Sequence, residues 1–241
     1  GKRGTQVARD VADMVLMDDA FPSIVRAVEQ GRIIFGNIKK FIIYQLSYHL
    51  AEIIIIAGIS FTMWHLPLLP LQLLFLNLLS DVFPALALGV GRGSKNIMEK
   101  SPKDPREPII TKKNWLITGL YGGVISLYVI AAYVFAYHGM KLSPEICNNI
   151  AFFALAFGQL LHVLDMREAD EPILMNQVTR NKYIWMALGF CIAMLLTGYF
   201  VPLFSHALSF VPLPAAAWGL ILAGALLPLL TNQIIKMIWK I

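Results

Sequence analysis

The 241-residue sequence is 57% hydrophobic and only 15% charged, and its formal net charge is +5. For a chain of this length, that composition indicates several membrane-spanning segments and excludes a water-soluble globular core as the main unit. The basic excess could suggest a nucleic-acid partner, but in a membrane chain the positions of the basic residues matter more than their sum.

The first 19 residues, GKRGTQVARDVADMVLMDD, carry acids throughout and have no continuous apolar core, so they do not form a cleaved signal peptide. They predict a short helix, a buried strand and an acidic turn, which is typical of the end of a soluble α/β domain. The chain begins without Met, so we expect a fragment of a longer protein. Residues 20–40 show a helical alternation of apolar and charged residues, which predicts an amphipathic stalk helix that continues into the first span.

Residues 41–241 predict an all-α membrane domain, a bundle of six transmembrane helices. Each helix is a stretch of the roughly 20 apolar residues that a bilayer requires. The stretches are 41–64, 68–90, 115–138, 146–164, 183–204 and 215–238. Alternate connections hold 19 of the 20 Lys and Arg residues, which places both termini in the cytoplasm. The basic excess is thus explained by topology, and we expect no nucleic-acid partner.

The second span carries polar residues near its middle. Asn77, Ser80 and Asp81 stand at i, i+3 and i+4, so their side chains project from one helical face. Pro84 cannot donate a backbone hydrogen bond to the carbonyl of Ser80, so we expect the helix to kink or unwind there and leave carbonyl oxygens free. In hydrocarbon such oxygens need a partner, and a bound cation is a natural one.

The first span places Glu52 near its midpoint, with His49 about one turn earlier. A short connection joins the first two spans, so they are antiparallel neighbours, and Glu52 and Asp81 can meet at similar depth. Two carboxylates that face one site in low dielectric repel each other unless a cation or a proton lies between them. Gln159 in the fourth span is a further candidate. Three roles stay open for His49: a contact between helices, a proton acceptor and a weak ligand.

Hydrogen bonding between helices is the alternative role for these residues. It suits Asn77 or Gln159 as well as ion binding does, because amides often join membrane helices. It suits Asp81 and Glu52 less, since a charge at mid-membrane costs on the order of 3 kcal/mol or more. Residues at the span ends are expected to be solvated or interfacial: His65, His138, His162, His206, Asp165 and Arg167. Cys147 and Cys191 are expected to be buried thiols.

Two long segments resemble a known family. GTQVARDVADMVLMDDAFPSIVRAVEQGR, followed by a basic stalk, is similar to the end of the phosphorylation domain of P-type cation-pumping ATPases. NLLSDVFPALALG resembles their sixth membrane helix and is most similar to the calcium-pump branch. The resemblance implies that residues 1–19 end the phosphorylation domain, that 20–40 form the stalk, and that 41–241 contain membrane helices five to ten. It also implies a multi-pass protein of the plasma membrane that works with the missing N-terminal portion of the same pump.

By this resemblance, Asn77, Ser80 and Asp81 take the positions of the ion-ligating residues of helix six. Glu52 takes the position of the helix-five glutamate, and Gln159 falls where helix eight contributes a side chain. His49 departs from the Asn that is common at its position, and Gln159 stands where some members have Glu. These departures concern the first of two possible calcium sites, and the second would need oxygens from helix four, which this sequence lacks.

The resemblance implies Ca²⁺ as the transported cation, and calcium favours six to eight oxygen ligands. Sodium, manganese and a proton countertransport role for Glu52 and His49 stay open. The 241 residues contain no DKTGT, TGES or GDGxND motif. ATP and Mg²⁺ would therefore act only through the missing cytoplasmic domains, and the chain alone should be inactive as an ATPase.

Two other functions compete with the pump. A secondary cation transporter or a channel could use the same intramembrane carboxylates, but a transporter usually shows an internal repeat, and none is visible. A membrane anchor that transports nothing would not need two mid-span carboxylates. The sequence therefore favours the transport half of a P-type cation pump.

Overall fold

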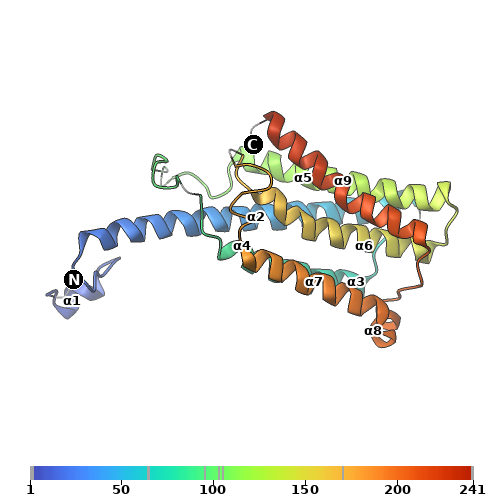
Figure 1. Ribbon diagram of the computed structural model, residues 1–241, viewed down its shortest axis with the longest axis horizontal. Helices are drawn as coiled ribbons and strands as arrows, with labels where there is room; N and C mark the ends of the chain where they lie inside the picture. Colours follow the sequence, from blue (N-terminus) through green and yellow to red (C-terminus); the bar gives the residue numbers. More distant parts are fainter. Residues whose placement is uncertain are drawn as a thin grey trace.

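The computed structural model describes residues 3–63, 66–94, 96–102, 104, 106–169 and 171–239, apart from the side chains of Met63 and Ser80. All regular structure among these residues is helical (Figure 1). Six helical segments are long and apolar enough to cross a membrane. The predicted all-α fold with six membrane helices is confirmed.

The N-terminal segment contains one short helix, α1 (Gln6–Asp10), whose first turn is capped by the hydroxyl of Thr5. The buried strand predicted after it is wrong, because residues 11–20 form only turns, bends and irregular backbone, and Val11 and Met17 are 79% and 73% exposed. A strand needs a neighbouring strand to complete its backbone hydrogen bonds, and the described residues supply none. Hydrogen bonds from Ser23 and from the backbone of Ala20 hold the pKa of Asp18 below its ordinary value, at the entry to the next helix.

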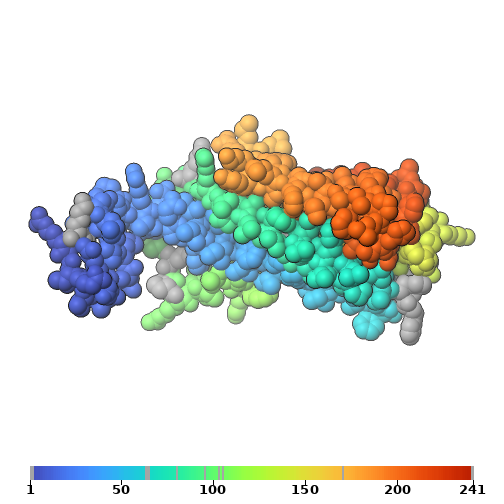
Figure 2. Space-filling view, turned by 90° about the horizontal axis from the view of Figure 1, so that it is seen from below, coloured from blue at the N-terminus to red at the C-terminus, as the bar shows by residue number. Residues whose placement is uncertain are grey.

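The helix α2 (Phe21–Met63) is 43 residues long and joins the stalk to the first span without a break, as the sequence predicted. Figure 2 shows its N-terminal part, in blue, extending beyond the helix bundle. The Asn37 amide donates hydrogen bonds to the carbonyl oxygens of Gly89 at 3.0 Å and Gly91 at 2.8 Å. These bonds tie the stalk to the end of the second span.

The second span is interrupted near its middle. It consists of α3 (Pro70–Leu76), the π-helix η1 (Asn77–Asp81) and α4 (Phe83–Gly89). Pro84 lies in the first turn of α4 and has no N–H, so it donates no backbone hydrogen bond back toward η1. The carbonyl oxygen of Leu79 lies 3.4 Å from the Cys191 thiol of another helix and accepts a hydrogen bond from it. The predicted unwinding near Pro84 is present, and both cysteines are buried free thiols as predicted.

The remaining helices complete the bundle. They are α5 (Lys112–Val134), which ends in the π-helix η2 (Phe135–Gly139), α6 (Pro144–His162), which continues as the 3-10 helix η3 (Val163–Met166), α7 (Lys182–Phe200), the short α8 (Pro202–Ala207) and α9 (Ala215–Trp239). Helix α6 is central, with 14 of its 19 residues buried, and runs between α9 and α7 (Figure 1). Figure 2 shows α7, in orange, beside the α3–α4 segment.

Small residues set the closest helix contacts around this centre. A Cβ added to Gly122 of α5 would lie 2.7 Å from the carbonyl oxygen of Ser47 on α2. A Cβ added to Gly224 of α9 would lie 2.9 Å from the Cβ of Ala154 on α6. In a bilayer, such close packing and polar contacts, rather than burial from water, hold helices together. The two glycines thus fix α2, α5, α6 and α9 at a spacing that brings their polar side chains into contact.

Candidate cation-binding site

The helices α2, η1 and α6 bring four of the predicted site residues together. The Nδ1 atom of His49 lies 3.0 Å from Glu52 Oε2, and its Nε2 atom lies 3.6 Å from Asp81 Oδ2. The Gln159 amide of α6 donates to Asp81 Oδ1 at 3.3 Å. The two carboxylates that the sequence expected to meet therefore face opposite nitrogens of one imidazole ring.

The hydrogen bonds around His49 define what its ring can do. Gln45 Nε2 lies 3.0 Å from His49 Nε2, so a neutral ring accepts there and donates from Nδ1 to Glu52. A second proton, on Nε2, would place an imidazolium between Glu52 and Asp81. By taking up a proton, the ring can offset one of the two carboxylate charges; a neutral ring leaves both charges for a bound cation.

Several oxygens of the site lack partners. Glu52 Oε1, Asn77 Oδ1 and Gln159 Oε1 are buried and have no hydrogen-bond partner among the described residues. Buried polar atoms without partners are costly, and although others occur elsewhere among the described residues, three oxygens on adjacent helices beside Asp81 favour a ligand site. Carboxylate and amide oxygens are the ligands that hard cations such as calcium prefer.

The donor set is not a cluster of acids alone. Within the described part of the chain, no group of three or more His, Cys, Asp or Glu side chains is arranged to hold a metal ion. A cation here would need amide and carbonyl oxygens in addition to Glu52 and Asp81. The backbone of Ser80 belongs to η1, whereas the predicted ligand role of its side chain lies outside the described residues.

Tyr44 was missed as a neighbour of this site. Its hydroxyl donates to the carbonyl oxygen of Gln159 at 3.4 Å, and its ring stacks on His162 with centroids 5.8 Å apart. Tyr44, Tyr48 and Glu52 recur every four residues, so they share one face of α2. This spacing is the signal that could have identified Tyr44 from the sequence.

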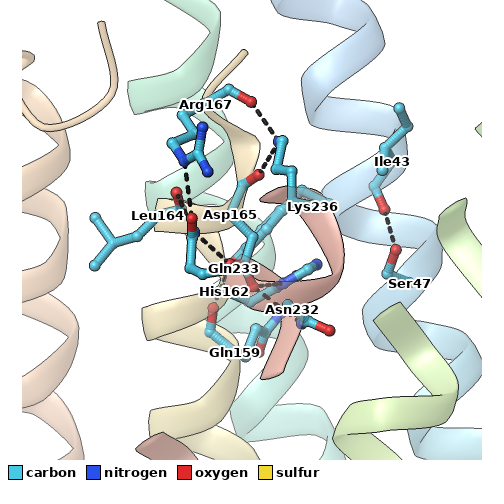
Figure 3. Close-up of polar contacts among 11 residues, drawn as sticks. Ile43, Ser47, Gln159, His162, Leu164, Asp165, Arg167, Asn232, Gln233 and Lys236 are labelled. Carbon is cyan, nitrogen blue, oxygen red and sulfur yellow. Dashed lines mark hydrogen bonds and ion pairs between the residues drawn. The ribbon is translucent and has the colours of Figure 1, made fainter. Parts of the chain in front are cut away.

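A second polar cluster lies where α6 ends against α9 (Figure 3). Asp165 is 1% exposed, and its carboxylate accepts hydrogen bonds from His162 Nδ1 at 2.9 Å, Asn232 Nδ2 at 3.0 Å and Gln233 Nε2 at 2.7 Å. His162 is also 1% exposed. The expectation that His162 is solvated and Asp165 interfacial is therefore wrong.

Arg167 is buried in the same cluster, which corrects its expected interfacial position as well. Its Nε donates to Gln233 Oε1 at 2.8 Å, and Lys236 Nζ donates to the backbone oxygens of Asp165 and Arg167. The expectation failed because it treated the end of the fourth span alone, whereas Asn232, Gln233 and Lys236 of α9 bury it. His138 and His206 are exposed as predicted, and His65 lies outside the described residues.

Comparisons with known proteins agree with this architecture. The family described as "Cation transporting ATPase, C-terminus" matches residues 65–238. Calcium-transporting ATPase 1 of Lactococcus lactis is 40% identical over 191 residues, which cover 79% of this chain and 21% of that protein. Calcium-transporting ATPase 1 of Bacillus cereus is 33% identical over 254 residues, which cover 100% of this chain and 29% of that protein.

A calcium-transporting ATPase of Bacillus subtilis is 32% identical over 95% of this chain. The chain spans only 21% to 29% of the length of these three relatives, and the family match covers most of the membrane domain. The resemblance seen in NLLSDVFPALALG and in the N-terminal segment is thereby confirmed. The chain belongs to the family of P-type cation-transporting ATPases and corresponds to their C-terminal region.

Proposed function

We propose that this chain is the ion-binding half of an ATP-driven calcium pump. The observation that carries the proposal is the set of partnerless buried oxygens on Glu52, Asn77 and Gln159, beside the carboxylate of Asp81. Hard oxygen donors from three helices suit calcium, and Pro84, which has no N–H, would leave a backbone oxygen of η1 free to bind the ion. Relatives named as calcium-transporting ATPases support the choice of ion.

The site has to balance charge whether or not the ion is bound. With calcium present, the carboxylates of Glu52 and Asp81 compensate the ion, and His49 is neutral. With calcium absent, a proton on His49 Nε2 would separate the same carboxylates, which lie 3.0 and 3.6 Å from its ring nitrogens. Calcium would offset both carboxylate charges, and the single imidazolium charge would offset one of them, which lowers the cost of the empty site in a low dielectric.

The proposal assigns ATP, Mg²⁺ and phosphorylation to the N-terminal portion of the same pump. Residues 1–19 would end its phosphorylation domain, and the stalk, residues 20–40, would transmit movement of that domain to Glu52 because α2 is unbroken. Both termini would lie in the cytoplasm and the helices in the plasma membrane. Reporter fusions after residues 65, 142 and 208 should then lie outside the cell, and a cytoplasmic signal at any of them would contradict this topology.

The decisive test is Asp81→Asn in the full-length pump. The amide keeps the size of the side chain but removes a charge from a low-dielectric site, so the apparent calcium affinity should fall about 100-fold or more. Phosphorylation by ATP should be titrated with calcium, and with sodium and manganese as competing candidates. Glu99→Gln is the matched control, because it makes the same chemical change at an exposed residue between the second and third spans.

Two outcomes would reject the proposal. If the Asp81→Asn variant transports calcium normally and loses only stability, Asp81 joins helices and does not bind the ion. If the wild-type protein moves calcium without any dependence on ATP, the carboxylates serve a secondary transporter or a channel. Normal behaviour of the Glu99→Gln control would show that a loss in the Asp81 variant comes from the site itself.

A further inference from the structure

A cavity of about 830 Å³ opens at the end of the bundle where α2 leaves the membrane domain. Its walls come from α2, α5, α9 and the connections that follow α4 and η3. Its volume is in the range of pockets that bind a drug-sized ligand, roughly 300–1,000 Å³. None of the candidate cation-site residues lines it, so it needs a separate explanation.

Three cations in the cavity wall are held by neutral oxygens. Arg32 donates to the carbonyl oxygens of Ile97 at 2.9 Å and Lys100 at 2.7 Å. Arg167 donates to a side-chain amide and to backbone carbonyls, and Lys236 donates to two backbone carbonyls. Carbonyl oxygens orient Arg32 without neutralising it, and its half-buried side chain faces no carboxylate in these contacts, whereas Arg167 and Lys236 are 3% and 6% exposed and lie beside Asp165.

The other charged residues of the wall do not remove this excess of positive charge. Lys40 and Lys100 share one carboxylate, Glu168, at 3.6 and 2.5 Å. Lys113, in the first turn of α5, is exposed and makes no ion pair or side-chain hydrogen bond within the described part of the chain. Altogether seven basic and four acidic residues line the cavity, and two of the acids, Asp104 and Glu107, are exposed. The wall is therefore net positive.

Part of the cavity wall is apolar. Ile43 of α2 and Ile117 and Tyr121 of α5 line it, and all three are at most 8% exposed. The cavity thus combines basic residues with an apolar surface, and it lies at the end of the bundle that the Lys and Arg distribution places toward the cytoplasm.

We propose that this cavity binds an anionic phospholipid of the cytoplasmic leaflet. The phosphate group lies among Arg32, Lys100 and Lys113, and an acyl chain packs against Ile117. Basic pockets between membrane helices on the cytoplasmic side suit such lipids, because the headgroup is anionic and the leaflet supplies it locally. The proposal concerns a site that is separate from ion transport.

Two substitutions test the charge and the space of the cavity. Lys113→Gln removes an unpaired cation, and Lys112→Gln is its control, because Lys112 is also exposed but does not line the cavity. Gly36→Leu fills the cavity from α2, where an added Cβ meets no atom within 4 Å. Gly119→Leu is its control, because that glycine is equally open but lies outside the cavity.

The experiment uses the full-length pump in neutral detergent, titrated with a fluorescent phosphatidylglycerol. Lys113→Gln should weaken binding about fivefold, the size expected for one basic residue at an anionic lipid surface. Gly36→Leu should weaken binding by at least as much, and both controls should bind as the wild type does. Calcium-stimulated phosphorylation is measured on the same samples.

The outcomes separate the two proposals. Three results would each overturn the lipid site. Phosphatidylcholine binds as tightly as phosphatidylglycerol, inorganic phosphate displaces the fluorescent lipid as well as unlabelled phosphatidylglycerol does, or both cavity variants bind the lipid as the wild type does. Lipid binding that follows the cavity substitutions would support it even if calcium never stimulates phosphorylation, in which case only the proposed function fails. Calcium-stimulated phosphorylation without lipid binding would reject the lipid site alone.

Discussion

Asp81 and Asp165 are both carboxylates within the helical membrane domain, but their surroundings differ. Asp165 is 1% exposed and accepts three side-chain hydrogen bonds, which involve both of its oxygens. Asp81 accepts one bond from Gln159, lies 3.6 Å from His49, and keeps 20% of its side chain exposed. Burial alone would have ranked Asp165 as the better candidate for a functional site.

The difference lies in how many oxygens around each carboxylate still lack a partner. Around Asp165, amides and a histidine from α6 and α9 donate to both carboxylate oxygens, although His162 Nε2 and Asn232 Oδ1 have no partner among the described residues. Around Asp81, three oxygens, those of Glu52, Asn77 and Gln159, lack partners among the described residues. A carboxylate with donors on both oxygens fixes one helix to another, whereas several partnerless oxygens on adjacent helices favour a ligand. Four substitutions test this comparison.

The largest effect on stability is expected from Asp165→Leu in the full-length pump. It removes the carboxylate bonded to His162, Asn232 and Gln233 and leaves Lys236 buried beside an apolar group, so the free energy of unfolding should fall by about 3–5 kcal/mol. Thermal unfolding in detergent measures this loss. Calcium affinity of the folded fraction should stay normal, and a stable variant that no longer binds calcium would reverse the two assignments.

The next effect is expected from Gln159→Leu. The substitution removes the donor to Asp81 and one partnerless oxygen, so apparent calcium affinity should fall about 10- to 100-fold, as it does when a group that orients a metal ligand is lost. Calcium titration of phosphorylation is the measurement. Gln30→Leu, at an exposed stalk residue, is the control, and equal losses in both variants would remove Gln159 from the site.

A smaller effect is expected from Pro84→Ala. Alanine can donate the missing backbone bond, which straightens the helix near η1 and should weaken calcium binding about three- to fivefold, the size of one net hydrogen bond. Pro228→Ala is the matched control, because Pro228 lies inside α9, a helix that contributes no candidate ligand. Unchanged affinity in the Pro84 variant would show that the interrupted backbone contributes no oxygen to the ion.

The smallest effect concerns Glu168, three residues after Asp165. Burial alone would raise the pKa of Glu168, but the hydrogen bond from Lys100 and the charge of Lys40 outweigh it and lower the pKa. Because the folded pKa is depressed, this stabilisation is present above the ordinary value of 4.5 and is lost as pH falls through the folded pKa. Lys100→Gln should therefore reduce the free energy of unfolding by roughly 0.5–1 kcal/mol at neutral pH. Thermal unfolding should show that difference shrinking in acid, and a difference that grows there would contradict the ion pair.

The sequence predicted most of the membrane fold, because spans, helix interruption and stalk depend on local hydrophobicity and on Pro84. It also proposed Glu52, His49, Asp81 and Gln159 as candidate site residues, because polar and charged side chains at mid-membrane are costly, and the structure brings these four side chains together. It could not show that His49 lies between the two carboxylates, since that depends on how α2 packs beside η1. It missed the Asp165 cluster for a related reason, because the polar residues of α9 make their hydrogen bonds only where α9 packs against the end of α6.

The length of α2 has a mechanical consequence. At 1.5 Å per residue, its 43 residues form a rod about 65 Å long, more than twice the thickness of the hydrocarbon layer. Glu52 lies about 46 Å from the first residue of this rod, so a tilt of only about 5° about that residue would displace Glu52 by roughly 4 Å. That displacement exceeds the 3.6 Å that separates His49 of α2 from Asp81 of η1. A lever of this length needs only a small angular input to open or close an ion site.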